Sequence, residues 1–161
     1  MGTRPSIGDG AFQNQNQQLT SLTFADDSRL VSIGADAFFI NQITSVVIPP
    51  SVRSIGQSAF AHNGILSVTF ADGIEYIANR AFEDNLLNSV VIPASVRYLR
   101  YRVFAANRLY TITIGAGVTV NNAAATMGAL GASFIRSYED NDSLAGTYTY
   151  AGGGNWNFTA P

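Results

Sequence analysis

The sequence of 161 residues predicts a mostly-β solenoid in which about five coils of 22 residues stack along one axis. The first observation behind this prediction is a phenylalanine that recurs every 22 residues, at positions 38, 60, 82 and 104. The second is an asparagine three positions after each phenylalanine, and the third is a set of apolar columns in the same register. A repeat of this length cannot bury its apolar face alone, so neighbouring repeats must stack.

The repeated strand is the best defined element of each coil. In the segment SVVI at positions 45–48, Val46 and Ile48 are two positions apart and point to the same side of a strand rich in β-branched residues. Proline follows at Pro49 and Pro93, where a missing N–H donor costs least. We therefore expect one short strand per coil, paired in parallel with the strands of the neighbouring coils.

The outward positions of these strands form the first candidate binding surface. By alternation two residues per coil point away from the core, and all of them are small and uncharged. They are Ser21, Thr23, Ser45, Val47, Ser67, Thr69, Ser89, Val91, Thr111 and Thr113. Such a face suits docking of a protein surface better than binding of a small charged molecule. The alternative is that small β-forming residues only satisfy the sheet.

A second candidate surface is a patch of tyrosine and arginine in the fourth unit. Its residues are Arg97, Tyr98, Arg100, Tyr101, Arg102, Arg108 and Tyr110, and Tyr76 extends it by one coil. Tyrosine and arginine are enriched at the residues that carry most of the binding energy of protein interfaces. The competing explanation is an ordinary charged, solvated surface.

The phenylalanine and asparagine columns are interpreted as structural. The phenylalanines would form a packing spine, and each asparagine amide would bond backbone groups at a buried turn. Gly34 and Gly56 are replaced by Ala78 and Arg100 in later units, so this position is not expected to require a positive φ.

Candidates for catalysis or metal binding are few. His62 is the only histidine and the chain has no cysteine, so neither a histidine pair nor a thiolate site can form. We expect His62 to be an exposed loop residue. Asp26 and Asp27 fall in a loop insertion, and the acidic residues between 139 and 142 lack the glycine and distal glutamate of a calcium loop. The sequence therefore predicts no catalytic residue, no cofactor and no metal site.

The charge balance restricts the class of partner. Only 12% of the residues are charged and the net charge is −2, so the positive field of a nucleic-acid-binding protein is absent. No apolar run approaches the roughly 18 residues of a membrane span. The first ten residues, MGTRPSIGDG, lack the hydrophobic stretch of a secretory signal. We expect no nucleic-acid partner, no membrane span and no signal peptide in this chain.

The two ends of the solenoid differ. Residues 6–12 align with residues 32–38, so the sequence opens in the second half of a coil. We expect Ile7 and Phe12 to be uncovered there, which would either permit self-association or mean that the sequence starts within a longer array. Residues 121–131 are expected to form a helix or compact loop, and the strand signals at 147–150 and 156–158 a hairpin. Residues 1–120 are thus assigned to the solenoid and 121–161 to a C-terminal cap of the same domain, anchored by Phe134, Ile135 and Tyr138.

The pattern LxxVxIPxxVxxIGxxAFxxN, which covers residues 6 to about 120, resembles the treponemal or BspA-like class of leucine-rich repeat. The tail AGTYTYAGGGNW resembles the hairpin that closes such arrays. The resemblance implies a right-handed, mostly-β member of the α/β-type horseshoe folds, with a parallel sheet on its concave face.

The resemblance also implies a function. It suggests a cell-surface, periplasmic or secreted bacterial protein that is not an enzyme and that mediates adhesion by binding a host extracellular-matrix protein or a bacterial surface protein. The alternative function is that of a structural protein that self-assembles into a homo-oligomer through its N-terminal end.

Overall fold

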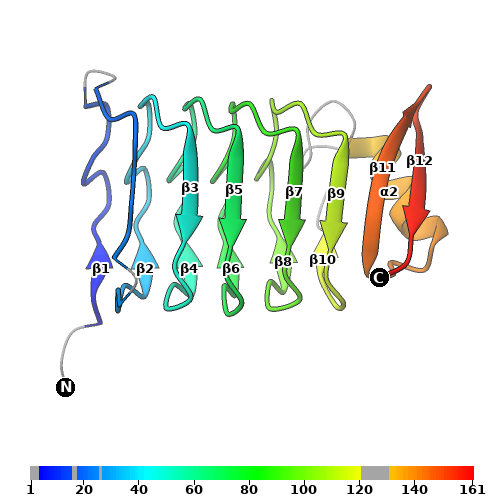
Figure 1. The fold of residues 1–161 in the computed structure, drawn as a ribbon, viewed down its shortest axis with the longest axis horizontal. Coiled ribbons are helices and arrows are strands. Elements are labelled where there is room, and N and C mark those ends of the chain that lie inside the picture. Colours follow the sequence, from blue (N-terminus) through cyan, green and yellow to red (C-terminus); the bar gives the residue numbers. More distant parts are fainter. Residues whose placement is uncertain (1–3, 16–17, 26, 121–130) are drawn as a thin grey trace.

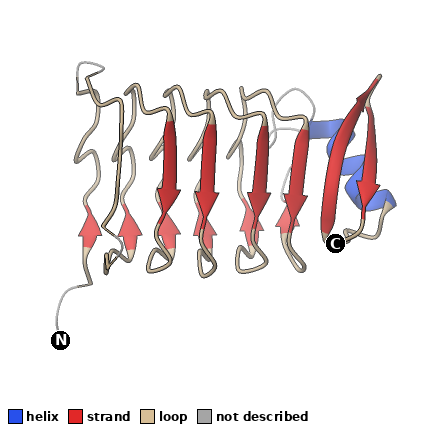
Figure 2. Ribbon diagram, viewed as in Figure 1, coloured by secondary structure: helices blue, strands red, loops and turns tan. Residues whose placement is uncertain are grey.

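The computed structural model describes residues 4–15, 18–25, 27–120 and 131–161. It confirms the predicted fold class, because the described chain winds into a mostly-β parallel solenoid of about five turns (Figures 1 and 2). Ser32 pairs with Ser54, Ser54 with Tyr76, and Tyr76 with Tyr98, which gives the spacing of 22 residues directly.

Each central coil contributes two strands, whereas the sequence predicted one. The longer strands carry the predicted alternation, and they are β3 (Ser45–Ile48), β5 (Ser67–Phe70), β7 (Ser89–Ile92) and β9 (Thr111–Ile114). The shorter strands lie on the opposite side of the coils (Figure 2), and they are β1 (Ser6–Ile7), β2 (Ser32–Ile33), β4 (Ser54–Ile55), β6 (Tyr76–Ile77), β8 (Tyr98–Leu99) and β10 (Thr119–Val120). The prediction of one strand per coil was therefore wrong. The sequence did not indicate the second strand, because two residues are too few to show an alternation of inward and outward side chains.

The core lies between the two rows of strands. The short strands form one parallel sheet in the order β1-β2-β4-β6-β8-β10, and most inward residues of both rows, such as Ile48 and Ile55, are buried, whereas Val68 and Phe70 of β5 are half-buried. The phenylalanine column is a packing spine, as predicted. The rings of Phe38 and Phe60 stack with their centroids 5.0 Å apart, and those of Phe60 and Phe82 follow at 5.2 Å.

The asparagine column forms the predicted ladder. Asn85 accepts a hydrogen bond from the N–H of Ile65 at 3.0 Å, and its Nδ2 donates to the carbonyl oxygens of Phe60, Phe82 and Glu83 at 2.9, 3.1 and 3.3 Å. Equivalent bonds are made by Asn41, Asn63 and Asn107. Because Ile65 and Phe60 belong to the preceding coil, every amide connects two coils as well as closing its own turn.

Two turn positions in each coil have a left-handed backbone. The first column consists of Gly10, Asp36, Ser58, Arg80 and Arg102, and the second of Asn14, Ile40, His62, Asp84 and Ala106, with φ between 45° and 62°. The sequence did not reveal these positions, because only one of the ten residues is glycine. The stacked turns impose a conformation that most of these side chains disfavour locally.

The glycines at positions 34 and 56 have a different role. As predicted, neither has a positive φ. A Cβ atom on Gly56 would lie 2.5 Å from the backbone nitrogen of Ala35, so the glycine permits a close approach of two neighbouring coils.

The C-terminal segment contains the helix α2 (Gly131–Asp140) and the strands β11 (Gly146–Gly152) and β12 (Asn155–Thr159). The predicted hairpin is confirmed, since β11 and β12 pair antiparallel with Tyr150 opposite Trp156. Of the three predicted anchors, Phe134 and Tyr138 are buried, and the side chain of Ile135 is outside the described ones. The expected helix or compact loop at residues 121–131 falls almost entirely outside the described residues.

We predict that Asn85→Ala lowers the free energy of unfolding by about 2–4 kcal/mol, because it leaves the buried N–H of Ile65 without a partner and removes one hydrogen bond from each of the carbonyls of Phe60, Phe82 and Glu83. Urea unfolding measures the loss. The matched control is Asn88→Ala, which truncates an exposed asparagine of the next strand segment and should change stability by less than about 0.5 kcal/mol. Equal effects of the two substitutions would contradict a special role for the ladder.

We predict that Ala106→Gly raises the free energy of unfolding by about 0.5–1 kcal/mol, because it removes the penalty of a Cβ atom in the left-handed region. Ala106 is exposed and has φ of 56°, so little else changes. The adjacent Ala105 is buried without a positive φ, and Ala105→Gly should be destabilising. Thermal unfolding of both variants decides the matter, and a destabilised Ala106→Gly protein would contradict the strain argument.

Candidate functional site

The ten outward residues of the long strands lie on one side of the solenoid. Those of β3, β5 and β7 are exposed, and Val47 and Val91 expose 63% and 61% of their surface although they are apolar. Ser21 and Thr23 are exposed beside β3, in a segment that is not a strand. Thr111 and Thr113 on β9 are half-buried. We call this surface of ten residues the neutral face, because none of its side chains carries a charge.

The C-terminal hairpin extends the neutral face. β11 pairs antiparallel with β9, so Thr147 lies opposite Thr113 and the two hydroxyl oxygens are 2.9 Å apart. Thr149 and the outward residues of β12, Asn157 and Thr159, continue the same uncharged surface. The sequence analysis identified the hairpin but missed these four residues as surface candidates, because nothing local indicates that β11 docks on β9.

An aromatic cluster holds this extension in place. Tyr148 is fully buried between β11 and α2, where its ring packs edge to face against Phe134 and Tyr138. Its hydroxyl donates to the carbonyl of Leu144 at 3.1 Å, and the hydroxyl of Tyr138 donates to the carbonyl of Val118 at 2.9 Å. Burial raises the pKa of Tyr148 to about 12, with a smaller contribution from the charge of Tyr138, and burial also raises the pKa of Tyr138.

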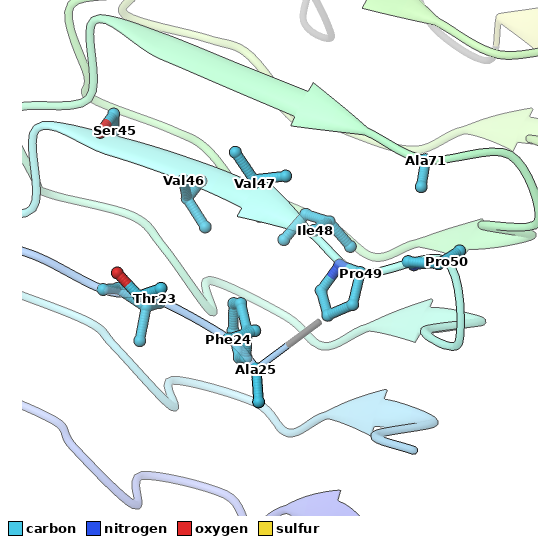
Figure 3. A pocket seen from close by; sticks show the side chains of 11 residues that line it. Thr23, Phe24, Ala25, Ser45, Val46, Val47, Ile48, Pro49, Pro50 and Ala71 are labelled. Carbon is cyan, nitrogen blue, oxygen red and sulfur yellow. The ribbon is translucent and has the colours of Figure 1, made fainter. Parts of the chain in front are cut away.

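A cleft interrupts the neutral face at the first coil. It has a volume of about 450 Å³ and separates the segment Leu22–Ala25 from β3. Figure 3 shows Thr23, Phe24 and Ala25 on one wall and the side chains of β3 on the other. No residue that lines the cleft is charged. The structure therefore combines a flat neutral surface with one apolar hollow.

The predicted tyrosine and arginine patch divides into separate groups. Tyr76 and Tyr98 are neighbours on β6 and β8, and the guanidinium carbon of Arg100 lies 5.2 and 5.7 Å from the centres of their rings. Arg97 is exposed at the start of the same group and Tyr101 at the turn that follows it. Tyr110 and the exposed Arg108 precede β9, where the carbonyl of Tyr110 accepts the N–H of Tyr150 in the hairpin.

Arg102 is engaged within the molecule. It forms a salt bridge with Glu83, which raises the pKa of the guanidinium through the hydrogen bond and the carboxylate charge. Arg80 also lies 3.5 Å from this carboxylate. The side chain of Arg102 is therefore less suited to a partner's carboxylate than the sequence suggested.

The two residues proposed for self-association lie at the first described coil. Phe12 stacks on Phe38 with a centroid distance of 5.2 Å and keeps 43% of its surface exposed, while Ile7 is half-buried on β1. This geometry leaves an aromatic surface at the beginning of the stack.

The candidates for chemistry stay apart from one another. His62 is exposed, as predicted, and its Nδ1 lies 2.7 Å from the Oδ2 of Asp84 in the next coil. Asp27 and the acidic residues between 139 and 142 are mainly exposed, and Asp26 is outside the described residues. Within the described ranges no group of three or more histidine or acidic side chains could hold a metal ion. In the same part of the chain, no helix has the length and apolarity needed to cross a membrane.

Comparisons with known proteins agree with this architecture. The family model described as BspA type leucine-rich repeat region matches residues 5–126 in six copies. Among solved structures, the pneumococcal vaccine antigen PcpA is similar to this chain with a TM-score of 0.63 and 25% sequence identity, over 70% of this chain and 28% of that one. This chain thus spans less than a third of PcpA, and no curated protein matches it.

We predict that the hairpin loosens as the pH rises from about 10 to about 12, because Tyr148 ionises near pH 10 when unfolded but only near pH 12 when buried. The unfolded state then holds fewer protons than the native state, so stability is full below pH 10 and falls above it. Fluorescence of Trp156, the single tryptophan, reports the transition. Tyr148→Phe should flatten the pH dependence, whereas Tyr98→Phe, which alters an exposed ring, should leave it as in the wild type.

Proposed function

The chain belongs to the BspA-type leucine-rich-repeat family, and from this premise we propose that it is a non-enzymatic protein-binding module of a bacterial surface or exported protein. Its partners are proteins of a host or of other bacteria, and the neutral face is the surface that contacts them. Leucine-rich-repeat proteins generally bind proteins, which supports this class of function.

The uncharged character of the neutral face carries the proposal. The face runs across the long strands and onto the hairpin, and it presents hydroxyls, two exposed valines and no charge. Removing such a surface from water costs little, since no ionised group must lose its hydration. Cores of protein interfaces are likewise depleted in charged residues. A small charged substrate would find neither a counter-charge nor an enclosed pocket on this face.

The similarity to PcpA supports a surface or exported location for this chain. PcpA is described as a pneumococcal vaccine antigen, which supports an extracellular or surface location for the present chain. An exported, adhesin-like role of the present chain agrees with that likeness and with an extracellular-matrix or bacterial surface protein as the partner.

The tyrosine and arginine patch is a second surface for the same function. Tyr76 and Tyr98 are 41% and 45% exposed and lie on the short-strand side, away from the neutral face. Arg100 between their rings adds a cation to this aromatic pair. A partner that contacted both surfaces would have to wrap around the coils, so the two surfaces can be tested separately.

Self-assembly is the alternative function. The exposed ring of Phe12 and the half-buried Ile7 at the first described coil favour it, because a second copy could continue the stack there.

We predict that Thr69→Arg combined with Ser89→Arg weakens binding to the partner by about tenfold or more, because it places two cations in the centre of a neutral interface. Binding to immobilised extracellular-matrix proteins and to intact bacterial cells is measured by surface plasmon resonance and by cell pull-down. The control is Gln57→Arg with Asn79→Arg, which adds the same charge at exposed turn positions outside the face.

Equal binding by both double variants would contradict the neutral face as the contact surface. If Tyr76→Ala with Tyr98→Ala abolishes binding instead, the short-strand patch is the contact surface. If the wild type binds none of these targets but forms oligomers in light scattering that Ile7→Asp dissolves, self-assembly is the better assignment.

A further inference from the structure

The row of long strands is divided between β5 and β7, which belong to separate sheets, and it is open at its first coil, where a cleft lies beside β3. In the central coils the N–H of Leu66 donates to the carbonyl of Thr44 at 2.9 Å, and four register pairs then join β3 to β5. Between the first coil and the segment that precedes β3, the last described backbone hydrogen bond runs from the N–H of Gln42 to the carbonyl oxygen of Leu19, at 3.0 Å. Residues 21–24 are not a strand and do not pair with β3.

The opening leaves backbone groups of β3 without a strand beside them. Backbone groups of alternate residues in a parallel strand point to opposite sides. The carbonyl of Thr44 bonds toward β5, so the backbone groups of Val46 and Ile48 also point toward β5. The N–H and C=O groups of Ser45 and Val47 therefore point toward the first coil. These groups border the cleft, because Ser45 and Val47 both line it. A strand edge of this kind is a template for another extended chain.

The surroundings of this edge are neutral and partly apolar. Phe24 and Pro49 contribute apolar surface, and the hydroxyls of Thr23 and Ser45 are the polar side-chain groups of the lining (Figure 3). A volume of about 450 Å³ falls in the range of small binding sites and is enough for a short segment rather than a folded element.

We propose that the cleft is a strand-acceptor site, which takes an extended, uncharged segment of the partner polypeptide and pairs it with the free edge of β3. This inference rests on the proposed function and specifies the chemistry of the partner: a β-forming stretch with small or β-branched side chains and no charge in the inserted part. Main-chain hydrogen bonds supply the affinity, and the apolar lining selects the side chains.

The molecule uses the same device at the other end of the row. There β11 adds to β9 in four register pairs, and its Tyr148 fills the space beneath the strand. At the first coil the space beside β3 has no such strand, and the residues that face it are as neutral as those that β11 covers. The inserted segment would extend the neutral face across the first coil.

The probe is a capped hexapeptide with the sequence of residues 44–49, TSVVIP, which has the strand character of the native neighbours. Isothermal titration with the full chain should give saturable binding of one peptide per chain. In an amide NMR spectrum the largest shifts should fall on residues 22–25 and 45–48. The same peptide with alternate backbone nitrogens methylated cannot pair with β3 and should bind about tenfold more weakly or worse.

The variants are matched by exposure. Val47→Arg puts a cation at the mouth of the cleft and should reduce peptide affinity by about tenfold or more. Leu66→Arg is the control, because Leu66 is also an exposed apolar residue, at 57% against 63% for Val47, but lies outside the neutral face and does not line the cleft, so this variant should leave the affinity unchanged. Thr23→Arg, on the opposite wall, provides a second test if Val47→Arg alters the fold.

The outcomes separate this inference from the proposed function. Absence of saturable peptide binding, or equal affinity of the Val47→Arg and Leu66→Arg proteins, overturns the strand-acceptor site. Undiminished affinity of the N-methylated peptide also overturns it, since the cleft would then be a mere apolar pocket. The protein-binding function would survive all three results if the Thr69→Arg with Ser89→Arg variant still lost its partner.

Discussion

The constraint on which this fold depends is that the backbone groups at the buried turn of every coil must find hydrogen-bond partners. One asparagine per coil meets it, by closing its own turn and by bonding the chain of the coil before. The amide therefore links turn formation to stacking, so a coil is complete only when its neighbour is present. This coupling explains why a protein without cysteine and with few charges can hold an elongated shape through packing and backbone pairing alone.

The same coupling produces the candidate site. Once the turns are fixed in register, the strands follow in register, and the outward residues become columns whose chemistry repeats from coil to coil. A surface of serine, threonine and valine is thus a property of the array and not of any single unit. Binding by such a face depends on area and shape, which suits a large partner and differs from a catalytic site with a few convergent groups.

Departures from the 22-residue register give the surface its individual features. The first interval between phenylalanines is 26 residues, and the long-strand segment of that coil lies apart from β3 and opens the cleft. After the fifth coil a hairpin replaces the repeat, and its first strand, β11, joins the row antiparallel to β9. The regular coils provide the flat face, and the irregular ends provide the places where a partner can distinguish this protein from others of similar architecture.

The sequence by itself determined the period, the buried columns, the asparagine ladder and the alternation of the long strands. All of these follow from contacts between residues that repeat at a fixed interval, so a single chain reveals them. It did not reveal the two-residue strands, or the left-handed turn positions held by residues such as Ile40 and Ala106, because no local preference marks them. Only the tertiary structure decided that β11 extends the sheet at β9, that Arg102 is engaged by Glu83, and that a cleft separates Leu22–Ala25 from β3. Each of these features depends on contacts between segments that have different sequence patterns. Neither the period of the repeat nor the spacing of residues predicts such contacts.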